Sequence, residues 1–136
     1  MTAPAGWRDV TRAVSERSGA ALDVAYDGPV GGGLAANLNI VRRDAERAPL
    51  TGLARRGQAE VDDLAGGRLD FTRLVPLRVD RALAVRYEFA TDADRVRQVG
   101  VLHEGSYYVI TLTAPRPAFR RAVPRLDGLL RSWRWD

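Results

Sequence analysis

The chain has 136 residues, of which 46% are hydrophobic and 28% are charged, a composition typical of a globular protein and not of a disordered chain. All 21 basic residues are arginines, and they are interspersed with 17 acidic residues, so that the net charge is +4. This mixing excludes the continuous basic stripe of a nucleic-acid-binding surface. The absence of cysteine excludes disulfides, thiolate metal sites and cysteine nucleophiles.

Length and the character of the N-terminal residues set two further expectations. A chain of this length predicts one domain, covering residues 1–136. Its first residues lack the basic region and apolar run of a signal peptide. No apolar run reaches the roughly 18 residues needed to cross a bilayer. We therefore expect a cytoplasmic protein with no direct membrane insertion.

Alternation of apolar and polar residues with a period of two predicts about six strands. These strands cover residues 22–26, 34–42, 69–79, 83–89, 96–103 and 107–113, and residues 6–11 are a further short candidate. Gly31-Gly32-Gly33 follows the first of them and predicts a bulge or wide turn, because no P-loop Gly-Lys-Ser/Thr comes after it. Pro76 predicts an edge position for its strand or a bulge within it.

Two stretches with helical spacing of apolar residues predict the main helices. The first covers residues 49–65, between Pro49 and the stop signal Gly66-Gly67, and Gly57 within it fits a close approach to the sheet. The second covers residues 119–133, where Pro124 is expected to kink the helix or restart it. Residues 12–19 predict a loop or a short helical turn. The fold class is therefore α+β, with an antiparallel sheet packed by two main helices.

Two turns decide which side chains share a face of this sheet. Glu104-Gly105 predicts a two-residue hairpin turn. Asp80-Arg81-Ala82 is interpreted as an odd-length turn, which places Val79 on the same apolar face as Leu83 and Tyr87. The opposite, semi-polar face then carries Arg86, Glu88, Gln98, Gly100, Leu102, Tyr107, Val109 and Thr111.

No catalytic or metal-binding motif stands out. The single histidine, His103, ends a strand beside a turn, and neither a third catalytic group nor a nucleophile-elbow motif accompanies its neighbour Ser106. No His or carboxylate cluster has metal-ligand spacing, so we expect neither metal nor cofactor. Asn37 and Asn39 lie on one face of a strand that ends at Arg42. Their amides either satisfy nearby backbone or water, or serve as polar contacts for a partner.

The order of motifs resembles the PsbP/DcrB-like superfamily. The chain shows Gly-Trp-x-Asp, Asn-Leu-Asn-Ile-Val, Val-Pro-Leu-x-Val, Tyr-Tyr-Val-Ile-Thr-Leu-Thr-Ala-Pro and a closing Ser-Trp-Arg-Trp. The residues that carry the resemblance are Gly33, Asn37, Asn39, Tyr108, Thr111, Thr113 and Trp133. Because this superfamily includes a Ran-binding nuclear-import factor and chaperones of type VI secretion effectors, the resemblance implies a non-enzymatic domain that binds other proteins.

Three hypotheses follow for function. The first is an adaptor or chaperone-like module that binds a partner protein, such as a secretion effector, on the open semi-polar face. Tyr107→Ala should then weaken binding and spare the fold, whereas Tyr108→Ala should destabilise it. The second is a small-molecule-binding protein or small enzyme with a pocket between sheet and helices, where His103, Tyr87 and Asn39 would converge. The third is a homodimer formed through the same face.

Overall fold

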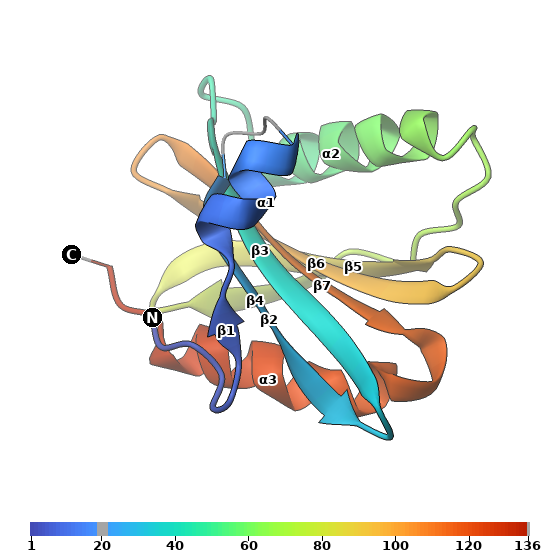
Figure 1. Ribbon diagram of the computed structural model, residues 1–136. Coiled ribbons are helices and arrows are strands. Elements are labelled where there is room, and N and C mark those ends of the chain that lie inside the picture. Colours follow the sequence, from blue (N-terminus) through green and yellow to red (C-terminus); the bar gives the residue numbers. More distant parts are fainter. Residues whose placement is uncertain (19–21, 136) are drawn as a thin grey trace.

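The computed structural model describes residues 1–18 and 22–135, which form one antiparallel sheet of seven strands between helices (Figure 1). The strand order is β1-β2-β3-β7-β6-β5-β4. In chain order the elements are β1 (Arg8–Asp9), α1 (Thr11–Ser18), β2 (Leu22–Gly31), β3 (Leu34–Asp44), α2 (Leu50–Leu64), β4 (Val75–Val79), β5 (Ala82–Ala90), β6 (Asp94–His103), β7 (Ser106–Pro115), a 3₁₀ turn (Arg116–Ala118) and α3 (Phe119–Ser132). The predicted α+β class is confirmed.

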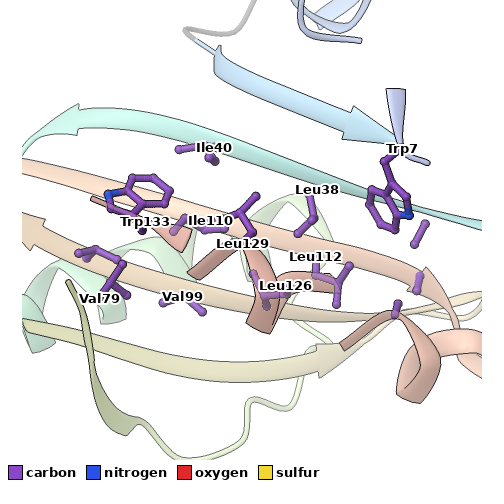
Figure 2. Close-up of a cluster of buried hydrophobic side chains, with 14 of the residues drawn as sticks. Trp7, Leu38, Ile40, Val79, Val99, Ile110, Leu112, Leu126, Leu129 and Trp133 are labelled. Atoms are coloured by element: carbon purple, nitrogen blue, oxygen red, sulfur yellow. The ribbon is translucent and has the colours of Figure 1, made fainter. Parts of the chain in front are cut away.

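Helix α3 covers one face of the sheet and forms the larger core with it (Figure 2). Its spacing explains this, because Phe119, Ala122, Leu126 and Leu129 recur every three or four residues and are all buried. The helix does not restart at Pro124. The sheet residues that meet it include Leu38, Ile40, Val79, Val99, Ile110 and Leu112.

Helix α2 covers part of the opposite face, as Figure 1 shows. Leu53 and Ala54 are buried under it, whereas Leu64 at its end is 91% exposed and does not belong to the apolar face. The helix ends at the predicted stop signal. There the Gly67 N–H donates to the Asp62 carbonyl (2.8 Å) and the Gly66 N–H to the Asp63 carbonyl (3.2 Å), which is a Schellman motif.

The turn between β4 and β5 corrects our assignment of faces. It has two residues, Asp80 and Arg81, with φ of 42° and 73°, and Val79 pairs directly with Ala82. Because a shift of one residue moves every side chain to the other face, the predicted odd-length turn was wrong for β5. Its apolar residues Leu83, Val85, Tyr87 and Phe89 lie on the α2 face, opposite Val79.

This turn also gives a stability prediction. Arg81 is a non-glycine residue with φ of 73°, a left-handed conformation that costs most L-residues roughly 1–2 kcal/mol. We expect Arg81→Gly to raise the free energy of unfolding by about 1 kcal/mol, measured by urea denaturation. The matched control is Arg125→Gly within α3, which should lower it by about 1 kcal/mol because glycine weakens helices. A lower stability for Arg81→Gly would contradict the turn geometry.

The other local predictions agree with the structure in part, because β4 covers only Val75–Val79 of the strand predicted at residues 69–79. Strand β4 lies at the sheet edge and carries Pro76, and the strand before Gly32-Gly33 contains an irregularity between the Pro29 and Gly31 pairs. That strand, β2, nevertheless continues past Pro29, where the sequence suggested a stop. The polar segment from Arg12 forms helix α1, and its predicted end at Gly19 lies outside the described residues.

Candidate functional site

A cleft of about 500 Å³ lies between α2 and the sheet. Its floor comes from four adjacent strands, β3, β7, β6 and β5, and its opposite wall comes from α2. Gly57 faces the Tyr87 hydroxyl, and a Cβ at that position would lie 3.7 Å from it, an ordinary van der Waals contact, so the approach of the helix does not require a glycine there. The lining residues are Asn39, Val41, Arg43, Asp44, Glu46, Leu53, Arg56, Gly57, Glu60, Val61, Tyr87, Gln98, Tyr107, Val109 and Thr111.

A chain of hydrogen bonds runs along the floor of the cleft. The Tyr87 hydroxyl donates to Gln98 Oε1 at 2.7 Å, and Gln98 Nε2 donates to Thr111 Oγ1 at 3.1 Å. Gln98 is buried, and these two bonds satisfy both ends of its amide. Because Thr111 Oγ1 is used as an acceptor, its own proton remains able to donate towards the cleft.

Asn39 stands directly opposite Thr111 in the ladder between β3 and β7. Side chains at such opposite positions lie about 5 Å apart on the same face. Within residues 1–18 and 22–135, the structure gives the half-buried Asn39 amide no hydrogen-bond partner. The cleft therefore holds one uncommitted amide beside one uncommitted hydroxyl proton.

Tyr107 forms one wall of the cleft and is itself 3% exposed. Its ring covers Gly100, where an added Cβ would lie 2.3 Å from the hydroxyl oxygen and 2.8 Å from Cε1. The hydroxyl is buried and has no hydrogen-bond partner among the described residues. Burial raises the pKa of Tyr107 to about 12, with Arg43 lowering it and Glu60 raising it to lesser extents.

Two ion pairs close the rim of the cleft. Arg43 on β3 binds Glu60 on α2 at 2.7 Å, and Arg56 on α2 binds Glu46 at 3.5 Å. Both pairs are half exposed, so each contributes at most about 1 kcal/mol to stability. Each pair is balanced in charge, whereas Asp44, which also lines the cleft, forms no ion pair among the described residues, so the lining carries one excess negative charge.

The structure divides the predicted contact residues between two faces. Gln98, Tyr107, Val109, Thr111 and Asn39 line the cleft. Gly100 and Leu102 share this face, Gly100 beneath the Tyr107 ring and Leu102 beside Leu53 and Tyr107, and Asn37 is exposed on the same face. The predicted open face is thus covered in large part by α2. Arg86, Glu88, Arg42 and His103 lie on the opposite face.

His103 does not approach the cleft. Its ring stacks on Trp135 at 3.9 Å, and Trp135 is fixed by donating Nε1–H to the Val79 carbonyl at 2.9 Å. Ser106 accepts instead from Arg42 Nε at 3.2 Å. Of the three groups expected to converge in a pocket, Tyr87 and Asn39 line the cleft and His103 does not. The described residues contain no group of three His or carboxylate side chains that could hold a metal ion.

Comparison with solved structures shows that this architecture is the PsbP-like fold, in agreement with the resemblance seen in the motifs. The sequence matches no protein family and none of the curated proteins. The cyanobacterial PsbP of Synechocystis sp. PCC 6803, CyanoP, has a TM-score of 0.65 and 14% identity, over 95% of this chain and 81% of CyanoP.

Two further structures share the fold. PA94 of Pseudomonas aeruginosa, a protein of unknown function, has a TM-score of 0.64 and 17% identity, over 82% of this chain and 81% of PA94. LpqN of Mycobacterium tuberculosis, involved in cell envelope biogenesis, has a TM-score of 0.54 and 13% identity, over 93% of this chain and 76% of LpqN. At these identities the likeness defines the fold and no site residue. Among the described residues, no helix has the length and hydropathy to span a membrane.

Proposed function

We propose that this protein is a non-enzymatic binding module that takes a small, uncharged, mainly apolar molecule into the cleft between α2 and the sheet. The observation that carries the proposal is the pair of uncommitted polar groups, Asn39 and Thr111, in a cleft of about 500 Å³. Ligand sites typically combine an apolar pocket of this size with a few polar groups that fix orientation. A carbonyl, hydroxyl or amide on the ligand would complete the hydrogen bonds of both residues.

The chemistry of the cleft favours binding over catalysis. Burial raises the pKa of both Tyr87 and Tyr107, so their hydroxyls stay protonated near neutral pH and suit hydrogen-bond donation rather than nucleophilic attack. Of the three lining carboxylates, Glu46 and Glu60 form ion pairs with arginines at the rim, and the exposed Asp44 accepts a hydrogen bond from the Glu46 N–H at 2.8 Å. A general base near the floor would need a group of shifted pKa within reach of the ligand, and the floor residues are amides, hydroxyls and aliphatic side chains.

The test uses N-phenyl-1-naphthylamine, a neutral apolar probe whose fluorescence increases in apolar sites. Gly57→Leu would fill the cleft, whereas Gly52→Leu places the same side chain on an exposed position of the same helix. Both changes remove a glycine from α2, so their effect on helix propensity is matched. We expect saturable binding to the native chain and to Gly52→Leu, and at least tenfold weaker binding to Gly57→Leu. Equal binding by the two variants would overturn the proposal.

A partner protein remains the second candidate, favoured by Asn37. This residue is exposed and continues the strip of Asn39 along β3, so a peptide could contact the strip where a small molecule in the cleft would not. Asn37→Arg should remove such a partner from a pull-down while leaving probe binding unchanged. If Gly57→Leu abolishes probe binding and Asn37→Arg causes no protein to be lost from the pull-down, the small-molecule role stands and the protein-binding role does not.

A further inference from the structure

An arginine-rich groove lies on the other face of the sheet, where β5 and β6 meet the start of α3. Its volume is about 530 Å³, and its lining residues are Glu88, Arg95, Arg97, Arg116, Phe119, Arg120 and Val123. Four arginines therefore face one glutamate, an excess of three positive charges in a chain whose whole net charge is +4.

Glu88 fixes two of these arginines in place. One carboxylate oxygen accepts from Arg95 Nη2 at 2.8 Å, and the other accepts from Arg97 Nε at 2.7 Å. Burial alone would raise the pKa of Glu88, but the hydrogen bonds from the two guanidinium groups lower it overall, so the carboxylate stays ionised. Both guanidinium groups also lie over the Phe119 ring, 5.5 and 5.9 Å from its centroid. Two planar donors are thus held rigidly against a buried aromatic wall.

The other two arginines, Arg116 and Arg120, form no ion pair with a carboxylate of residues 1–18 or 22–135. Arg116 donates its Nε–H to the Thr91 carbonyl at 3.0 Å, which orients the guanidinium group without cancelling its charge. Arg120 is exposed and forms no ion pair within the described residues. Asp94 is the first residue of β6, and its carboxylate forms no ion pair with the four arginines of the groove. The groove therefore presents pre-oriented guanidinium donors and a local excess of positive charge.

We propose that this groove binds a small molecule that carries two phosphate groups. Guanidinium groups match phosphate oxygens with paired, parallel hydrogen bonds. A phosphate monoester carries about −1.5 to −2 charges at neutral pH, so two phosphates balance the excess of three positive charges, whereas a single carboxylate does not. Phe119 and Val123 add an apolar wall that suits the organic part of such a ligand. This site lies across the sheet from the α2 cleft and is independent of it.

The test is isothermal titration of the full chain with inorganic pyrophosphate. Arg120→Gln removes one groove charge, and Arg125→Gln removes the same charge from an exposed position of the same helix. A charge-assisted hydrogen bond contributes about 1.5–3 kcal/mol, so Arg120→Gln should weaken binding by roughly 10- to 100-fold. Arg125→Gln should leave it within about twofold.

Three other binding results would each contradict the proposal. Equal losses in the two variants would show general attraction to a basic surface. Orthophosphate binding as tightly as pyrophosphate would show a site for one phosphate, and binding of hexaglutamate alone would show a site for acidic peptides. Equal melting temperatures of the two variants and the native chain would exclude unfolding as the cause of a lost signal. Since the fluorescent probe of the α2 cleft is uncharged, failure here leaves that proposal standing.

Discussion

Tyr107→Ala is expected to lower the free energy of unfolding by about 3–5 kcal/mol, as truncation of large buried aromatic residues does. Tyr107 is 3% exposed and packs against Leu53 and Ala45. Its ring also covers Gly100, which has no side chain to replace the lost contacts. Urea denaturation monitored by circular dichroism measures the change, with Leu64→Ala as a control that should stay within about 0.5 kcal/mol because Leu64 is 91% exposed.

Tyr107→Phe removes the hydroxyl and keeps the ring, so it measures the contribution of the hydroxyl to stability separately from that of the ring. The hydroxyl is buried with no hydrogen-bond partner in the part of the chain that the structure describes, and an unsatisfied buried group costs about 1–3 kcal/mol. We therefore expect Tyr107→Phe to raise the free energy of unfolding by about 1 kcal/mol. A clear loss of stability would show that the hydroxyl has a partner in solution, and would place a bound water or ligand at this wall of the cleft.

This expectation reverses the one drawn from the sequence, where Tyr107 was assigned to an open face. The alternation of apolar residues identified β6 and β7 and the hairpin between them correctly, since Glu104-Gly105 fits a two-residue turn and Leu102 does pair with Tyr107. Period-two patterning says which residues share a face. It does not say which face a helix covers, because that depends on contacts between segments far apart in the sequence.

The cleft could be predicted only in part for the same reason. Asn39 and Tyr87 were proposed as converging groups, and both line it. Their convergence depends on β5 turning its apolar side to α2, and Asp80-Arg81 lacks the Asn-Gly or Asp-Gly signal that marks a two-residue turn. The arginine groove is harder still to see. Glu88 and Arg97 meet because they are directly paired in the ladder between β5 and β6. Phe119 belongs to α3, more than twenty residues later in the sequence.

Trp7→Ala is the second substitution with a large expected effect, and it should lower the free energy of unfolding by about 3–5 kcal/mol. Trp7 is 8% exposed and extends the α3-side core towards the N-terminal segment, as Figure 2 shows. Its indole ring lies on Gly28 of β2, where an added Cβ would lie 2.3 Å from Cδ1. Contact this close to a ring atom leaves no room for a methyl group. Gly28→Ala should therefore cost about 1–3 kcal/mol through overpacking.

The two changes together test whether the ring and the glycine depend on each other. Once Trp7→Ala has removed the ring, Gly28→Ala should add less than about 0.5 kcal/mol, so the double-mutant cycle should show a coupling of about 1 kcal/mol or more. Gly128→Ala is the control, because a Cβ there meets nothing within 4 Å and should raise stability slightly through helix propensity. If Gly28→Ala costs the same with and without Trp7, the indole does not lie on β2 in solution. The N-terminal residues would then contribute little to the α3-side core.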